Sequence, residues 1–345
     1  MPLDLPGVDA AGKASAILNR LQQLYPQLID LSLGRVQRLL AQLGHPERLL
    51  PPVIHVAGTN GKGSTCAFLR AIAEASGWRV HVTTSPHLVN LRERFRIAGT
   101  LVDNAALTQV LAEIETVNAG QPITVFEVLA AAGFLLFARA PAELCVVEVG
   151  LGGRFDATNV IDAPACAVIT SISLDHQDFL GDTLEKIAWE KAGIMKPGRP
   201  VVAGDQSPGV MSVLTKAAAE TGATLLIRHR DWDIAPTQAG LRFADAEGAL
   251  DLPLPSLPGA HQIENAGLAV AALRASGLAA PEHAFAGVGR ATWPGRLQRL
   301  RGALAAQLPA DFELWLDGAI TPAPARLCTC NSKLGATSRS ILPSA

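Results

Sequence analysis

A glycine-rich segment around residue 60 carries the strongest chemical signal in the sequence. It reads His55-Val-Ala-Gly-Thr-Asn-Gly-Lys-Gly-Ser-Thr65, follows an apolar run and opens a stretch with helical periodicity. Glycines allow backbone N–H groups to surround phosphate oxygens, and the N-terminus of the following helix adds positive charge. Lys62 can reach the outer phosphates, so the segment is predicted to be a phosphate-binding loop.

The loop departs from the common G-x-x-x-x-G-K-[ST] spacing. Val56 stands where the first glycine belongs, and Gly63 separates Lys62 from the hydroxyl residues. The alternative is an ordinary glycine-rich turn between a strand and a helix. The order of strand, glycines, lysine and helix favours phosphate binding over that alternative.

Polar side chains at the ends of three other apolar runs suggest a cation site. Ser85 follows the run 79–83, Glu148 closes the run 144–149, and His176 follows the run 165–172. A hydroxyl, a carboxylate and an imidazole at one edge of a sheet could hold a divalent cation whose remaining ligands are water and phosphate oxygens. Each residue alone also has a structural interpretation. That interpretation is weakest for Glu148, because a carboxylate at the end of a buried strand needs a partner.

Lys191 lies in the apolar context Trp189-Glu-Lys-Ala-Gly193. Gly193 would end a helix, and a lysine in the last turn is favoured by the helix dipole. From the residues alone that structural interpretation is preferred, and a functional one stays open.

Alternating apolar runs and amphipathic stretches predict an α/β fold with a parallel sheet and helices on both faces. The expected strands are Val53–Ala57, Arg79–Thr83, Leu144–Val149, Ala165–Ile172 and Pro200–Ala203. The expected helices are Ser64–Ser76, Asn104–Val117, Val125–Arg139, Leu184–Lys191, Val210–Thr221 and His261–Ala275. Binding sites in such sheets lie at the carboxyl ends of the strands, where the residues above are found.

Composition narrows the class of protein. The chain has 345 residues, 29 Lys and Arg against 31 Asp and Glu, 49% apolar residues and 17% charged residues. These values exclude a disordered chain and a basic nucleic-acid binder. The five cysteines are irregularly spaced, and the sequence shows no signal peptide and no apolar run of membrane-spanning length. We therefore expect a cytoplasmic protein. We also expect it to be a monomer without nucleic-acid or membrane partners.

The pattern changes toward the C-terminus. Beyond residue 225 the segments are short and rich in Gly and Pro, and Trp293-Pro-Gly-Arg296 is a candidate hinge. The strand-like run Phe312–Leu316 ends in Asp317-Gly-Ala319, and residues 320–345 contain no acid and no periodicity. We expect a domain over 1–295 and the start of a second unit over 296–319.

Many separated motifs together resemble the folylpolyglutamate synthase/dihydrofolate synthase branch of the Mur ligase family. The resemblance covers residues 28 to 319. Its motifs are IDLSLGRV (29–36), HVAGTNGKGST (55–65), SPHL (85–88), ERF (93–95), FE (126–127), VEVGLGGRFDATN (147–159), LDHQDFLGD (174–182), EKAG (190–193), HQIEN (261–265), WPGR (293–296) and LDGA (316–319).

The resemblance implies roles for the matching residues. The ATP-binding residues would be Gly58, Thr59, Asn60, Gly61, Lys62, Gly63, Ser64, Thr65, Asn265, Arg296 and Asp317, and the magnesium ligands Ser85, Glu148 and His176. Lys191 would be carbamylated and support a second Mg²⁺, which reverses the structural interpretation above. Lys62, Lys191 and His176 would be the catalytic residues, and Leu31, Arg35, Phe126 and Glu127 would lie near the pterin-bearing substrate.

The implied reaction is ATP-dependent amide ligation. The carboxylate of a folate or of dihydropteroate would attack the γ-phosphate of ATP, and L-glutamate would displace phosphate from the resulting acyl phosphate. Cell-wall Mur ligases are an alternative, but they carry an extra N-terminal domain and only 57 residues precede Gly58. A GTPase is disfavoured because the sequence has no Asn-Lys-x-Asp motif.

A second alternative is an ATP-binding pseudoenzyme. Only 49 residues, 297–345, remain for the second domain of this family. The family motif Asp-Gly-Ala-His-Asn-Pro is replaced here by Asp317-Gly-Ala-Ile-Thr-Pro322, as a one-nucleotide deletion would produce. Residues 320–345 are therefore predicted to be a frameshifted, disordered tail, and ligation by the truncated chain is expected to be weak.

Overall fold

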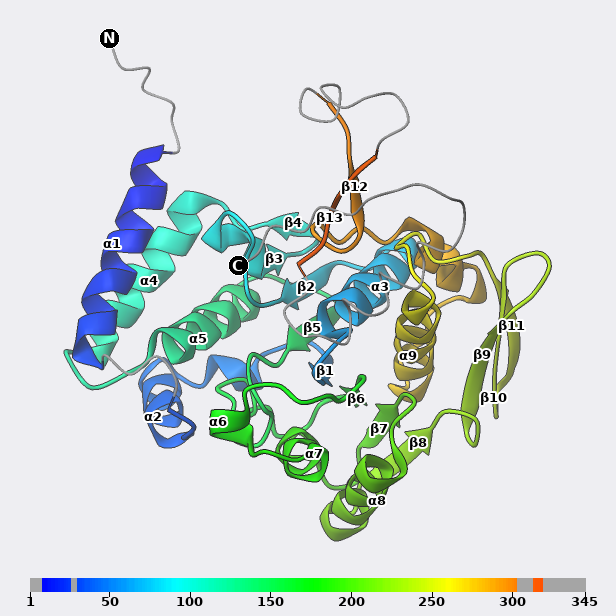
Figure 1. The fold of residues 1–345 in the computed structure, drawn as a ribbon. Helices are drawn as coiled ribbons and strands as arrows, with labels where there is room; N and C mark the ends of the chain where they lie inside the picture. Colours follow the sequence, from blue (N-terminus) through cyan, green and yellow to red (C-terminus); the bar gives the residue numbers. More distant parts are fainter. Residues whose placement is uncertain (1–7, 26–29, 303–312, 319–345) are drawn as a thin grey trace.

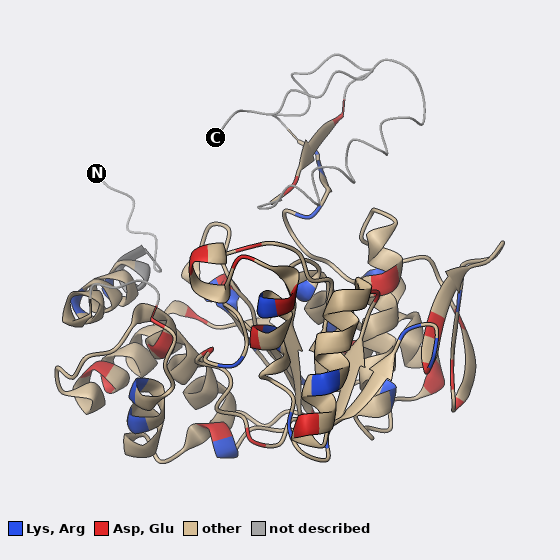
Figure 2. Cartoon of the chain, turned by 60° about the horizontal axis from the view of Figure 1, so that its bottom comes forward, with Lys and Arg blue, Asp and Glu red and all other residues tan. Residues whose placement is uncertain are grey.

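The computed structural model describes residues 8–25, 30–302 and 313–318. The tail predicted over 320–345 lies outside the described residues. No helix within the described ranges is long and apolar enough to cross a membrane. Basic and acidic residues are interspersed over the visible face of the molecule (Figure 2).

An eight-stranded sheet forms the centre of the molecule, in the order β4-β3-β2-β5-β1-β6-β7-β8. Its strands are β1 (Val53–Ala57), β2 (Val80–Thr83), β3 (Phe95–Ile97), β4 (Thr100–Leu101), β5 (Leu144–Glu148), β6 (Cys166–Ile169), β7 (Pro200–Ala203) and β8 (Thr224–Ile227). The pairs formed by β2, β5, β1, β6, β7 and β8 are parallel, which confirms the predicted class. The antiparallel edge strands β3 and β4 and the last strand β8 were not predicted.

Helices cover both faces of this sheet (Figure 1). They are α1 (Val8–Leu24), α2 (Gly34–Gln42), α3 (Lys62–Ala75), α4 (Asn104–Asn118), α5 (Val125–Ala138), α6 (Gln177–Leu180), α7 (Leu184–Ala192), α8 (Pro208–Thr221) and α9 (His261–Ala275). Side chains alternate between the faces of β1: Ile54 and Val56 pack with α3 and α9, whereas Val53 packs with α4 and α5. The strand is buried on both sides, which explains its continuous apolar run.

A second sheet packs against α9. It contains β9 (Trp232–Pro236), β10 (Leu241–Asp245) and β11 (Gly248–Leu252), all antiparallel. In β10 buried Leu241 and Phe243 alternate with exposed Arg242 and Ala244. This period of two is typical of a strand with one buried face, but the glycine and proline content of the region hid it in the sequence.

The C-terminal part of the described chain is a two-stranded hairpin of β12 (Gln298–Leu300) and β13 (Leu314–Leu316), which projects from the body (Figure 1). Of the strand expected over 312–316, residues Leu314–Leu316 are a paired strand, and Phe312 lies outside the described residues. Two hydrogen bonds join the residue after β13 to the candidate hinge. The Gly318 N–H donates to the Gly295 carbonyl at 2.7 Å, and the Arg296 guanidinium donates to the Gly318 carbonyl at 2.9 Å.

Candidate active site

A cavity of about 650 Å³ opens at the carboxyl ends of β1, β2, β5 and β6. It collects most of the residues singled out in the sequence. Its walls include Gly58, Thr59, Asn60, Gly61, Lys62, Gly63, Ser64, Ser85, Glu148, His176, Lys191, Asn265, Arg296, Asp317, Leu31, Phe126 and Glu127. Thr65 and Arg35 lie outside the wall. Thr65 is fully buried within α3, and Arg35 lies behind Glu127.

The phosphate loop has the expected conformation between β1 and α3. Gly58 and Gly61 have φ values of 149° and 90°, which other residues rarely adopt. A Cβ at Gly63 would lie 2.6 Å from the ring of Trp293, from the candidate hinge. The unusual glycine after Lys62 is therefore explained by the close approach of Trp293.

Two lysines converge on this loop. Lys62 Nζ donates to the carbonyls of Gly58 and Thr59 at 3.1 Å each, and Lys191 Nζ donates to the Gly58 carbonyl at 2.8 Å. Lys191 is only 4% exposed. Its burial, assisted by the charge of Lys62, lowers its pKa to about 7. The Lys191 amine is therefore desolvated and lies beside the phosphate loop.

The backbone around Gly153 fixes the end of α7, which carries Lys191. A Cβ at Gly153 would lie 2.7 Å from the Glu190 carbonyl oxygen and 2.8 Å from that of Lys191. The Arg154 N–H donates to the Glu190 carbonyl at 2.8 Å, and Asn159 Nδ2 bridges the carbonyls of Arg154 and Gly193. The paired glycines 152 and 153 therefore allow the last turn of α7 to sit close enough to direct Lys191 inward.

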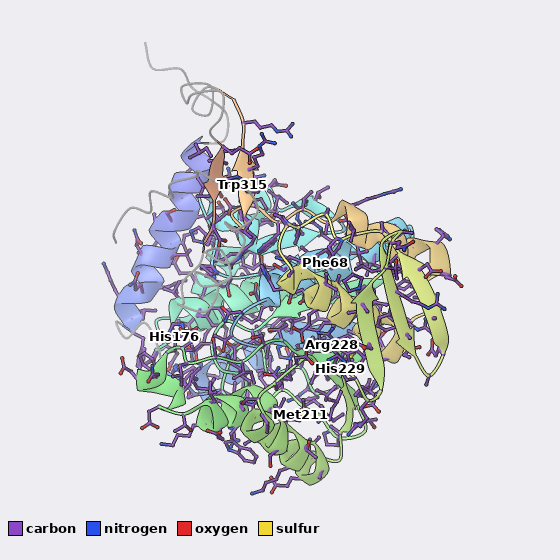
Figure 3. All side chains as sticks on the ribbon, turned by 45° about the vertical axis from the view of Figure 1, so that its right-hand side comes forward. Phe68, His176, Met211, Arg228, His229 and Trp315 are labelled. Atoms are coloured by element: carbon purple, nitrogen blue, oxygen red, sulfur yellow. The ribbon has the colours of Figure 1, made fainter. Side chains whose placement is uncertain are left out.

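The three candidate metal ligands share the cavity but differ in exposure. Glu148 is 5% exposed, and burial raises the pKa of its carboxyl despite the opposing charge of Lys62. Its Oε2 accepts the Ser85 N–H at 3.0 Å. His176 precedes α6 and has a side chain that is 44% exposed (Figure 3).

Within the described ranges no three His, Cys, Asp or Glu side chains form a cluster that could hold a metal ion. A site based on Glu148 and His176 therefore requires other oxygen ligands, and the Ser85 hydroxyl is available at the same wall. A buried carboxylate beside a hydroxyl is a suitable donor set for Mg²⁺ or Mn²⁺, so these residues fit the expected cation.

Another part of the cavity wall consists of side chains. The ring of Phe126 lies directly against Gly150. Glu127 is 3% exposed and accepts two hydrogen bonds from Arg35 Nε, at 3.1 and 3.0 Å. Arg35 also donates to the Asp30 carboxylate at 2.8 Å. Arg35 thus donates hydrogen bonds to two wall residues, Glu127 and Asp30, and does not itself reach the cavity.

Helix α9 and the hinge complete the wall near the phosphate loop. Asn265 contacts Gly61 and donates to Gln262 at 3.0 Å, and Gln262 in turn donates to Ser64 at 3.3 Å. On the hinge side, the Leu297 N–H donates to the Asp317 carboxylate at 3.4 Å. Residues from distant parts of the sequence therefore surround one loop.

The sequence interpretation missed several wall residues that lie inside its own motifs. Arg94 and Asp156 both line the cavity, although neither was assigned a role. Burial lowers the pKa of Arg94, whose Nε donates to His87 at 2.9 Å. Asp156 is 2% exposed, and its burial raises its pKa. Arg94 lies in the motif ERF (93–95) and Asp156 in the motif VEVGLGGRFDATN (147–159), and this was the available signal. Spacing alone does not show which side chain faces the cavity.

Comparisons with known proteins agree with this geometry. The Mur ligase middle domain family matches residues 56–273. The dihydrofolate synthase/folylpolyglutamate synthase of Escherichia coli K12 is 43% identical over 84% of this chain and 67% of its own length, and that of Mycobacterium tuberculosis is 37% identical over 93% and 70%. The structure of E. coli FolC in complex with DHPP and ADP has a TM-score of 0.86 at 39% identity, covering 97% of this chain and 77% of that chain.

The fold and the phosphate loop thus define a protein of the Mur ligase class. Within that class, the chain belongs to the dihydrofolate synthase/folylpolyglutamate synthase family. It spans about two thirds of the length of the curated relatives it matches, with 67%, 65% and 70% of the first three covered.

Proposed function

We propose that this protein is an ATP-dependent ligase that joins L-glutamate to the carboxyl group of a folate, of dihydropteroate, or of both. The observation that carries the proposal is one cavity whose wall has two kinds of lining. The phosphate loop, Lys62, Lys191 and Glu148 form the part that we call the nucleotide end, and Phe126 with the buried acids Glu127 and Asp156 forms the part that we call the pterin end. Such a cavity can bring a nucleotide phosphate next to the carboxyl group of an aromatic substrate.

Relatives support the identity of the ligands. One solved relative, at 39% identity, is described in complex with DHPP and ADP, and another, at 37% identity, with Mn, AMPPNP and L-glutamate bound. The corresponding ligands of this chain would be ATP, a divalent cation, a pterin-bearing acid and glutamate. We place the protein in the cytoplasm, where such small molecules are available.

The nucleotide end would hold the phosphates of ATP. The N–H groups at the start of α3 and the Lys62 ammonium group would bind the β- and γ-phosphates, with Asn265, Arg296 and Asp317 as further nucleotide contacts. Ser85, Glu148 and His176 would hold Mg²⁺, and carbamylated Lys191 would support a second ion. A bound Mg²⁺ would neutralise charge on the transferred phosphoryl group.

Carbamylation is chemically reasonable at Lys191. The reaction requires a neutral amine, and burial has already lowered the pKa of this lysine to about 7. Carbamylation would convert the amine into a carbamate beside the phosphate loop. This carbamate would supply an oxygen ligand for the second cation.

The substrate carboxylate would attack the γ-phosphate to give an acyl phosphate and ADP. The glutamate amine would then attack the acyl carbon, and inorganic phosphate would leave. Lys62 and the start of α3 would stabilise the charge that develops on the phosphoryl oxygens. We further propose that residues from 296 onward begin a second unit, whose contacts at Arg296 and Asp317 would close over the nucleotide and exclude water.

The test is turnover of the purified chain with ATP, Mg²⁺, L-glutamate and either dihydropteroate or tetrahydrofolate. We expect multiple turnovers of ADP and phosphate release only when both the pterin acid and glutamate are present. With an ¹⁸O-labelled pterin carboxylate, one ¹⁸O atom should appear in the released phosphate, as an acyl phosphate requires. Nucleotide binding without any turnover would instead indicate a pseudoenzyme.

A further inference from the structure

Two histidines are fully buried in the central sheet, and their surroundings differ. His81 in β2 uses both ring nitrogens: Nε2 bonds to the Ala140 carbonyl at 2.9 Å, and Nδ1 accepts the Ala98 N–H at 3.1 Å. His55 in β1 bonds through Nε2 to the Thr158 hydroxyl at 2.9 Å, and its Nδ1 has no partner. The function proposed above does not use His55.

The hydrogen bonds around Thr158 run in one direction, from His55 to Thr158 and from Thr158 to Asp156. In its ionised form the Asp156 carboxylate can only accept, and its Oδ1 then accepts both the Thr158 N–H at 2.9 Å and the Thr158 hydroxyl at 2.5 Å. The hydroxyl oxygen must therefore accept its second hydrogen bond from His55. Because burial lowers the pKa of His55 to about 3, the ring is neutral and its single proton must be on Nε2. This assignment also explains why Nδ1 has no partner.

The same carboxylate holds a loop of the cavity wall. Asp156 Oδ2 accepts the Leu151 N–H at 2.8 Å. Residues 150–152 and 155–156 line the cavity, and the Phe126 ring lies against Gly150. We call residues 150–156 the wall loop. His55 and Thr158 are absent from the cavity wall, and their hydrogen bonds connect them to this loop through Asp156.

We propose that His55 and Thr158 are positioning residues that hold Asp156, and through it the wall loop, in the shape that binds the pterin-bearing acid. The identity of the ligand rests on the proposed function, whereas the effect on the loop does not. Each link is a hydrogen bond between buried groups, and loss of one leaves its partner unsatisfied.

The first test measures the loop directly, by hydrogen–deuterium exchange of the full chain without ligand. Thr158→Val removes the hydroxyl at nearly constant volume, and we expect the wall-loop amides to exchange about 10-fold faster, as loss of one buried hydrogen bond implies. Thr158→Ser retains the hydroxyl and should exchange like the wild type. A Thr158→Val loop with wild-type exchange would overturn the proposal.

Substitutions at His55 test the donor. The side-chain amide nitrogen of glutamine can occupy the position of Nε2, whereas that of asparagine reaches only the position of Nδ1. We expect His55→Gln to preserve wall-loop protection and His55→Asn to lose it. His81→Asn is the matched control, because it removes a buried histidine from another strand of the same sheet without touching Thr158. Equal loosening of the loop by the two asparagine variants would show that His55 has only a general structural role.

The second test measures binding by titration calorimetry with dihydropteroate and, separately, with MgADP. Thr158→Val should weaken dihydropteroate binding by about 5- to 10-fold and leave MgADP affinity within about 2-fold. Unchanged dihydropteroate affinity with a loosened loop would refute the role in substrate positioning. If the wild type binds MgADP but no dihydropteroate, the proposed substrate is wrong, and the exchange data still decide whether His55 and Thr158 hold the loop.

Discussion

Under the proposed function the cavity has a nucleotide end and a pterin end, and the two are built from different kinds of chemical group. At the nucleotide end the main elements are backbone groups, glycines and two lysines, grouped around residues 58–64 and Lys191. At the pterin end the wall consists of large or charged side chains, and buried hydrogen bonds fix them from behind, as between Arg35 and Glu127. A backbone-built site depends on local conformation, whereas a side-chain-built site depends on partners distant in the sequence.

The difference predicts how each end responds to substitution. Changes at the nucleotide end should alter phosphate chemistry and leave pterin binding largely intact. Changes behind the pterin wall should alter pterin affinity and stability while MgADP still binds. Figure 3 shows His176 on a different part of the molecule from Arg228 and His229, which lie between β8 and β9 and do not line the cavity.

The largest effect is expected from Lys62→Ala. Loss of this charge should lower the rate of ligation by about 1,000-fold or more, because phosphoryl transfer depends on electrostatic stabilisation. Single-turnover measurement of ADP formation checks the effect. Lys186→Ala, which removes a 62% exposed lysine of α7, is the control and should retain the wild-type rate. Dihydropteroate affinity should be the same in both variants, and a loss of it in Lys62→Ala would break the separation of the two ends.

The phosphate loop could be predicted from sequence because its chemistry is local. Strand, glycines, lysine and helix occur within about a dozen consecutive residues, and helix 261–275 was also predicted with its observed bounds. The wall at the pterin end could not be predicted in this way. Arg35 acts through Glu127, which is 92 positions away, and His55 through Thr158, which is 103 positions away. Residue type and periodicity do not reveal such partners, since only the folded sheet brings them together.

Arg35→Ala tests the pterin end and is expected to have the next largest effect. It leaves the 3% exposed Glu127 carboxylate without its cationic partner, so the free energy of unfolding should fall by about 3 kcal/mol. Denaturant unfolding measures this change. Arg139→Ala removes the exposed pair with Glu113 and should leave stability unchanged within error. Equal stability of the two variants would show that Glu127 does not need Arg35.

Lys191→Met should reveal a pH-dependent cost of burying the amine. The pKa of Lys191 is about 7 in the folded protein and 10.5 for the ordinary side chain, so between these values unfolding takes up a proton. This contribution makes the folded state of the wild type more stable as pH rises through that window, whereas Met contributes no such change. The stability advantage of Lys191→Met should therefore shrink by about 2–3 kcal/mol between pH 7 and pH 9.

The measurement requires CO₂-free buffer, because carbamylation would remove the amine from the titration. Lys216→Met, which changes a 72% exposed lysine, is the control and should show no comparable pH dependence relative to the wild type. A constant difference between Lys191→Met and wild type across this range would mean that Lys191 retains an ordinary pKa in the folded protein. In that case, addition of bicarbonate should not change the free energy of unfolding of the wild type.

The smallest effect concerns the contact between the phosphate loop and the hinge. Gly63→Ala places a Cβ 2.6 Å from the Trp293 ring, which must move, and should cost about 1–2 kcal/mol of stability. Trp293→Leu provides space for that methyl group, so in this background Gly63→Ala should cost about 1 kcal/mol less. The double-mutant cycle isolates this coupling from the loss of the indole itself. Additive costs would show that Trp293 is not the reason for the glycine at position 63. Coupling would show that a side chain more than 200 positions away constrains the backbone of the phosphate loop.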